Sequence, residues 1–187
     1  NLEHKRHTLA HLLAAAVLVD YPHAKLTLGP AVETGFYYDI DFSAGEAPGD
    51  DNLKGIQKNM RKMLSQWTGF THQEVSVDEA REIFKNNPFK IELIDEIEAK
   101  GETITIYTAG AETKAEFTDL CRGGHSENPA KEIDPDSFKL DKVAGAYWRG
   151  DEKNPMLTRI YGLAFDSAEE LKAYEAQLEE AKQRDHR

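Results

Sequence analysis

The apolar residues of this chain repeat with a helical period in some stretches and with a strand period in others. From His4 to Val19 they recur at helical spacing, which predicts a buried helix. Helical stripes or helix-start signals also cover residues 53–67, 76–85, 91–98 and 167–187. Strand-like runs cover residues 25–28, 35–42, 70–75, 103–107, 117–120, 138–148 and 156–161. Because helices and hairpins follow one another without regular strand–helix–strand alternation, we expect an α+β fold, an antiparallel sheet packed with helices.

Charge and composition limit the function classes. The 187 residues include 23 basic and 34 acidic side chains, so the net charge is −11. That argues against binding of a long duplex through bulk electrostatics, but it is compatible with holding one RNA end in a local pocket. No apolar run is long enough to cross a bilayer. The single cysteine, Cys121, excludes an internal disulfide and indicates a reducing, cytoplasmic compartment. The first residue is Asn1, without an initiator Met or a signal peptide, so we expect a processed chain or an internal fragment.

Two pairs of potential metal ligands have the same spacing. His7 and His11 lie four residues apart on one face of the predicted first helix, and Cys121 and His125 lie four apart in a glycine-rich loop. Imidazole nitrogens and a thiolate are the ligands of a tetrahedral zinc site. Thr8 stands where a metalloprotease helix would carry its general-base Glu, so that class is excluded. Spacing alone does not show that the two pairs converge, and each pair is also compatible with a structural role.

Other residues near these pairs have more than one interpretation. Cys121 could act as a nucleophile with His125 as its base, although the sequence has no obvious nucleophile elbow. Lys90 follows Pro88-Phe89 and precedes an apolar run, which is typical of a surface lysine. Asp119 and Arg122 flank Cys121 and could form a local ion pair of little energetic weight.

Three stretches resemble the editing domain of bacterial threonyl-tRNA synthetases. The most specific is the third, because no simple physical reason accounts for its length. The first stretch consists of His7 to Ala14 and Leu28 to Asp39. The second is Asp119 to His125. The third consists of Phe138 to Leu140, Ala144 to Asp151 and Met156 to Gly162. The end of the chain is similar to the helix that leads into the catalytic core of these enzymes, so the resemblance covers nearly all of residues 1–187.

The resemblance implies one editing domain of the threonyl/alanyl-tRNA synthetase type, in which residues 167–187 form a helix toward an absent catalytic domain. The implied reaction is hydrolysis of mischarged seryl-tRNA(Thr), and the partners are the acceptor end of tRNA(Thr) and the rest of the synthetase chain. The parent enzyme is a ligase of protein biosynthesis, but its ATP and Mg²⁺ site is not in these residues. Editing requires no cofactor, and Zn²⁺ stays an option at His7, His11, Cys121 and His125.

The resemblance also assigns roles to individual residues. His11 would activate water or orient a ribose hydroxyl, and Lys90, in the matching Pro-aromatic-Lys, would hold water or stabilise the oxyanion. Cys121, His125 and Asp119 match further catalytic positions. Substrate would be bound by His7, which matches the related alanyl-tRNA synthetase pattern, by Arg122, and by pocket walls at Gly35, Phe36 and Tyr37. Two alternatives are a free-standing trans-editing deacylase and a non-catalytic module that binds zinc or positions tRNA.

Overall fold

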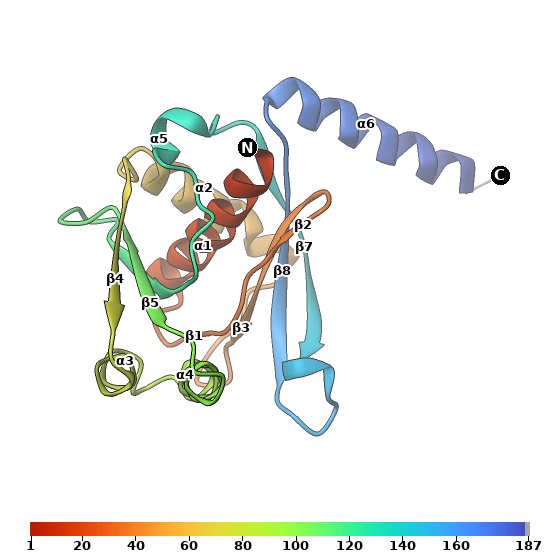
Figure 1. The fold of residues 1–187 in the computed structure, drawn as a ribbon. Coiled ribbons are helices and arrows are strands. Elements are labelled where there is room, and N and C mark those ends of the chain that lie inside the picture. The colour runs from red at the N-terminus through yellow and green to blue at the C-terminus, as the bar shows by residue number, and fades with distance from the viewer. Residues whose placement is uncertain (186–187) are drawn as a thin grey trace.

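The computed structural model describes residues 1–185, in which two antiparallel sheets lie on either side of a central helix, α1 (Leu2–Asp20) (Figure 1). The strands of the larger sheet are β1 (Lys25–Leu26), β2 (Ala31–Val32), β3 (Gly35–Asp41), β7 (Phe138–Tyr147) and β8 (Met156–Ala164). Their order is β1-β3-β8-β7, and β2 also pairs with β3. The smaller sheet has the order β4-β5-β6, with β4 (Phe70–Val75), β5 (Ile104–Ala109) and β6 (Phe117–Leu120). The expected α+β class is confirmed.

The other helices connect or cover these sheets. They are η1 (Asp50–Asn52), α2 (Leu53–Leu64), α3 (Val77–Ile83), α4 (Pro88–Ala99), α5 (Pro129–Glu132), η2 (Trp148–Gly150) and α6 (Ala168–Asp185). Most predicted elements are present within a few residues of their expected ends, and the strands at 70–75 and 117–120 coincide with the prediction. The sequence analysis missed β2 and the short helices η1, α5 and η2. The predicted last two residues of the final helix, His186 and Arg187, lie outside the described residues.

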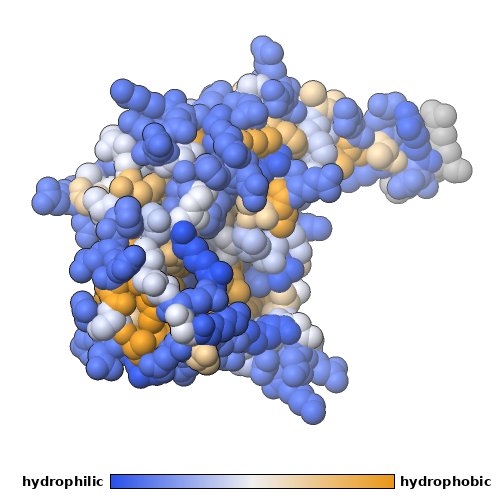
Figure 2. Space-filling model, viewed as in Figure 1, coloured by the Kyte–Doolittle hydropathy of each residue, from blue (hydrophilic) through white to orange (hydrophobic). Residues whose placement is uncertain are grey.

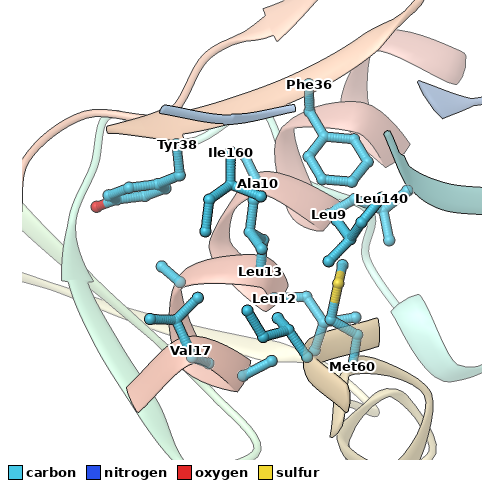
Figure 3. Packing of buried hydrophobic residues seen from close by; sticks show 14 of the residues in the cluster. Leu9, Ala10, Leu12, Leu13, Val17, Phe36, Tyr38, Met60, Leu140 and Ile160 are labelled. Carbon is cyan, nitrogen blue, oxygen red and sulfur yellow. The ribbon is translucent and has the colours of Figure 1, made fainter. Parts of the chain in front are cut away.

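The core is built around α1, which is buried along most of its length. Leu9, Leu12, Leu13 and Val17 have at most 1% of their surface exposed. A helix that is apolar on nearly every side must be covered on every side, and the two sheets and α2 provide this cover. Figure 3 shows these side chains packed against Phe36, Ile160 and Met60, with the ring of Tyr38 at the margin and its hydroxyl pointing away from the cluster.

The start of α4 brings Lys90 into the interior of the molecule. The Asn87 side chain accepts hydrogen bonds from the backbone N–H groups of Phe89 and Lys90 and so caps the helix. The Asn87 amide also donates to the Leu26 carbonyl at 2.7 Å, which ties the helix start to β1. Lys90 lies in the first turn and is 2% exposed.

Helix α6 extends away from the rest of the chain (Figure 1). Leu171 is its one buried residue among residues 168–185. The helix begins with the Ser167 hydroxyl accepting from the Glu170 N–H at 3.2 Å. Within residues 1–185, no helix is both long and apolar enough to pass through a lipid bilayer.

Candidate functional site

The two pairs of potential ligands converge on one point. α1 carries His7 and His11, and the loop after β6 carries Cys121 and His125. One ligand atom from each of these four side chains lies within 4.8 Å of the other three. We call these four residues the His–Cys cluster. The two pairs are far apart in the sequence, so they meet only because the loop after β6 passes over α1.

Three contacts hold the cluster together. The Nε2 atoms of His7 and His11 are 3.2 Å apart. The Cys121 Sγ lies 3.6 Å from the His7 Nε2 and 3.3 Å from the His125 Nε2. The His125 ring stacks on Phe70 at 4.2 Å and on His7 at 4.5 Å between ring centroids, which fixes its plane.

These three distances are close to the edges of a tetrahedral zinc site. With Zn–N near 2.05 Å and Zn–S near 2.3 Å, tetrahedral edges are about 3.3 Å between nitrogens and about 3.6 Å between nitrogen and sulfur. The outer nitrogens are also placed as zinc ligands require, because the His11 Nδ1 lies 3.0 Å from an Asp119 carboxylate oxygen and the His7 Nδ1 lies 3.2 Å from the Gly124 carbonyl. Three of the six distances between the ligand atoms therefore match Zn²⁺, and all six lie within 4.8 Å.

Without a metal, the same contacts specify where protons sit. The carbonyl of Gly124 and the carboxylate of Asp119 only accept, so the Nδ1 atoms of His7 and His11 both carry hydrogen. The contact between the two Nε2 atoms needs one further hydrogen. The pair thus holds three protons on four nitrogens and carries one positive charge.

The environment favours placing this charge on His11. Burial opposes it, but the hydrogen bond to Asp119 and the interaction with Cys121 overcome burial and raise the pKa of His11 to about 9. Burial also opposes a Cys121 thiolate, yet interactions with His11 and His125 lower the pKa of Cys121 to about 4. Burial lowers the pKa of His125, which keeps its ring neutral. At neutral pH the cluster therefore contains an imidazolium on His11 and a thiolate on Cys121.

Asp119 joins this cluster to a buried lysine. Its Oδ2 accepts hydrogen bonds from His11 and from the Tyr38 hydroxyl, at 3.0 and 2.8 Å, and its Oδ1 lies 2.6 Å from the Lys90 Nζ. Burial opposes ionisation of Asp119, but the charge of Lys90 and the bond from His11 hold the pKa of the carboxyl well below its usual range. Burial raises the pKa of Tyr38 well above its ordinary value, so Tyr38 stays protonated and donates.

Every hydrogen of the Lys90 ammonium group already has an acceptor. The Nζ atom lies 2.8 Å from the Thr27 carbonyl, 3.1 Å from the Tyr38 hydroxyl and 2.6 Å from Asp119. An ammonium has three donors, so none is left for a substrate oxygen in this arrangement. The ordinary interpretation of Lys90 as a surface side chain is wrong, since its side chain is 3% exposed.

The network opens into a cavity of about 340 Å³. We call it the site cavity. It is lined by residues of the network and of α4, among them His7, His11, Tyr38, Lys90, Asp119 and Cys121. Figure 2 shows a hollow on the corresponding face, bordered by hydrophobic side chains and by strongly hydrophilic ones. The volume is in the range of small-molecule sites, and polar groups converge at one end of it.

Comparison with known proteins finds relatives that match the chain over part of their length. No family model matches the chain. It is 50% identical to a threonine–tRNA ligase of Thermotoga neapolitana over 99% of its length, 47% identical to that of Rubrobacter xylanophilus over 97%, and 46% identical to that of Borreliella burgdorferi strain ZS7 over 98%. The chain is homologous to one segment of threonine–tRNA ligases. It spans 28%, 27% and 30% of these relatives, respectively.

The homology to threonine–tRNA ligases confirms the family resemblance seen in the sequence, and the structure places most of the residues expected in the site. His7, His11, Lys90, Asp119 and Cys121 line the site cavity, and His125 contacts Cys121. Arg122 lies at the cavity with an exposed side chain that pairs with Glu102 at 2.6 Å, rather than with Asp119.

The structure does not bring the three expected wall residues to the site cavity. Phe36 is fully buried in the core, and Gly35 packs against β8, where a Cβ would lie 1.8 Å from the Gly162 carbonyl oxygen. Tyr37 points to the opposite face of β3 and lines a different cavity. Tyr38 and Thr27 hold positions that sequence reasoning missed. Because side chains alternate between the two faces of a strand, the sequence could have predicted that Tyr37 and Tyr38 lie on opposite faces of β3. It could not have predicted which of these faces meets the site.

Proposed function

We propose that this chain is the editing domain of a threonine–tRNA ligase and hydrolyses the seryl ester of mischarged tRNA(Thr). The observation that carries the proposal is a cavity with His7, His11 and Cys121 at one end, in a chain homologous to part of these ligases. Its partners would be the acceptor end of tRNA(Thr) and the rest of the synthetase, in the cytoplasm.

A ligase for threonine needs such an activity for a physical reason. Serine lacks one methyl group and fits wherever threonine fits. A methyl-sized difference in a binding pocket gives only about 10- to 200-fold discrimination. A second site that admits the seryl ester and excludes the additional methyl supplies the remaining accuracy. An editing site separate from the ligation site needs a small cavity with groups that can support hydrolysis. The size of the site cavity and the side chains at its end support this proposal.

The proton arrangement suggests how the ester bond would break. The lone pair of the His7 Nε2 accepts the hydrogen of His11 in the metal-free network, so that bond must open first. His7 would then take a proton from water as that water attacks the ester carbonyl. His11, already an imidazolium, would protonate the leaving ribose oxygen. One proton is accepted and one is donated, so the pair returns to its starting charge after a proton passes between the two Nε2 atoms. This assigns His11 the acid role, in place of the base role expected from the sequence.

Lys90 and Asp119 act as positioning residues in this proposal. With its three hydrogens used, Lys90 holds Asp119 and Tyr38, and Asp119 holds the His11 ring. The Cys121 thiolate and His125 shape the end of the cavity. Attack by Cys121 on the ester is the competing route, and it would leave a seryl thioester that a rapid quench could trap.

A second candidate function is zinc binding, and the three near-tetrahedral edges of the cluster favour it. His7, His11, Cys121 and His125 would hold the ion, with Asp119 and Gly124 orienting two of the rings. A bound zinc would supply a Lewis acid or a fixed structural link. Metal analysis of the purified chain, beside a deacylation assay before and after chelation, separates this function from metal-free hydrolysis.

The proposal is tested by deacylation of seryl- and threonyl-tRNA(Thr) with the same chain. Seryl ester should be hydrolysed at least about tenfold faster, the low end for a methyl-sized difference. Comparable rates for the two esters would contradict size exclusion. Activity of the metal-free chain would count against an obligatory zinc, and a trapped seryl-enzyme together with an inactive Cys121→Ser variant would establish the thioester route instead.

A further inference from the structure

A second cavity adjoins the site cavity on the far face of the larger sheet. It has a volume of about 580 Å³ and shares Leu28 and Gly29 with the site cavity. We call it the side groove. Three aromatic residues and two arginines line it, namely Tyr37, Tyr147, Trp148, Arg149 and Arg159. None of these five residues takes part in the network around Asp119.

Both guanidinium groups in the side groove lie over aromatic rings. Arg159 lies 4.0 Å from the centre of the Tyr37 ring and makes two hydrogen bonds to Asp39, at 2.7 and 2.9 Å. Arg149 lies 4.8 Å from the centre of the Trp148 ring. A guanidinium held on one face by a ring leaves its other face available for a further planar group.

The turn that carries Arg149 is also held rigidly. Arg149 pairs with Glu92 and Glu96 on α4, at 3.1 and 2.6 Å, and the Trp148 indole N–H donates to Glu92 at 2.7 Å. Arg149 has a φ of 58°, which costs energy for a residue with a side chain. Nearby, Tyr147 is 40% exposed, so its ring is accessible from the groove.

This lining matches a site for unpaired nucleotides. Proteins bind single-stranded RNA by stacking bases on aromatic rings and on guanidinium planes. Each arginine is already neutralised by neighbouring carboxylates, so the groove would recognise bases more than phosphates. Such recognition is compatible with a chain of net charge −11, which cannot rely on bulk attraction of RNA.

We propose that the side groove binds the unpaired nucleotides immediately before the esterified terminal nucleotide of the tRNA, while the terminal nucleotide enters the site cavity. The inference rests on the proposed function, because that function places an RNA 3′ end in the site cavity. Because Leu28 and Gly29 line both cavities, the two cavities are neighbours, and a strand entering one lies close to the other.

The test compares two non-hydrolysable probes by calorimetry on the 187-residue chain. The first is the serine amide of 3′-amino-3′-deoxyadenosine, and the second is the same amide at the end of the RNA tetramer ACCA. The tetramer should bind at least about tenfold more tightly, as expected for one or two stacked bases. Tyr147→Ala should remove most of this gain and leave binding of the mononucleoside unchanged, whereas Tyr147→Phe should keep the gain.

Variants of Arg149 separate stacking from charge. Arg149→Lys keeps the charge and loses the plane, so it should lose as much of the length-dependent gain as Arg149→Gln. Arg61→Ala, which removes an exposed arginine on α2, is the matched control and should keep the gain. The dependence of log affinity on log salt should be no steeper than about −1.4, the value for two phosphates on a single strand.

Each outcome decides between the claims. Binding of the mononucleoside without any gain from the tetramer, or a gain that survives Tyr147→Ala, overturns the side-groove assignment and leaves the proposed function standing. A full rescue by Arg149→Lys or a much steeper salt dependence overturns the stacking account. Failure of both probes to bind contradicts the proposed function, and the side-groove assignment falls with it.

Discussion

Asp119 is the residue through which the site is organised. Its carboxylate accepts from His11 and Tyr38, pairs with Lys90, and also accepts from the Leu120 N–H at 2.8 Å. A buried carboxylate is stable only when its charge is compensated by such partners. The positions of the imidazole, the phenol and the ammonium group therefore depend on one another, and a change at one should displace the others.

Removal of the Lys90 charge should destabilise the fold as well as reduce activity. Lys90→Met removes the nearer of the two cations beside the buried Asp119 carboxylate, and loss of one partner from such a buried pair costs about 3–5 kcal/mol of unfolding free energy. The double variant Lys90→Met/Asp119→Asn should lose less stability than Lys90→Met alone, because the carboxylate that Lys90 compensates is removed as well. Urea unfolding measures both. A Lys90→Met chain of unchanged stability would show that Lys90 does not hold the network.

The thiol of Cys121 should react as a thiolate in the metal-free chain. A lowered pKa means that the thiolate is present at any pH above about 4, so alkylation by iodoacetamide in the presence of a chelator should be nearly independent of pH between 6 and 9. An ordinary thiol, with a pKa near 8.5, reacts faster with each pH step in this range. His11→Ala should restore part of that dependence, because the imidazolium is lost. A tenfold rise per pH unit through pH 8 in the unmodified chain would contradict the assigned charges.

At the scale of elements, patterns of period and capping were sufficient to predict most helices and strands. Ser76 accepts from the Glu79 N–H and Glu79 returns a bond to the Ser76 N–H, as the Ser-x-x-Glu pattern predicts. Short elements such as β2 and α5 carry too few residues to show a period. The face of β3 that meets the site was not predictable either, since alternation separates two faces without naming them.

Gly35 has a packing role in this structure, in place of the expected substrate contact. A Cβ at position 35 would lie 1.8 Å from the Gly162 carbonyl oxygen on β8, and backbone cannot move aside as a side chain can. Gly35→Ala should therefore destabilise the chain by about 3 kcal/mol, the upper part of the range for overpacking. Gly49→Ala, where no atom lies within 4 Å of the new Cβ, is the control and should be nearly neutral. Equal midpoints for the two variants in thermal unfolding would contradict this packing.

On the scale of the whole molecule, the site exists because distant segments meet between the two sheets. His11 and Asp119 are 108 residues apart in the chain, and Lys90 and Thr27 are 63 apart. Local pattern identified His7 with His11 and Cys121 with His125 as pairs, but it could not show that they converge. The family resemblance placed Lys90 and Asp119 in the site, and only the structure shows that Lys90 has all its donors occupied.

The central claim is that the His7–His11 pair on α1 hydrolyses the seryl ester. The most direct measurement is the single-turnover rate of seryl-tRNA(Thr) deacylation by the chelated chain and by its His11→Ala variant. Arg61→Ala, at an exposed position on α2 outside the site, is the control. Loss of a general acid should slow the reaction at least about 10²-fold, while the control stays within twofold of the unchanged chain. Full activity of His11→Ala, or no hydrolysis by the unchanged chain, would contradict the account.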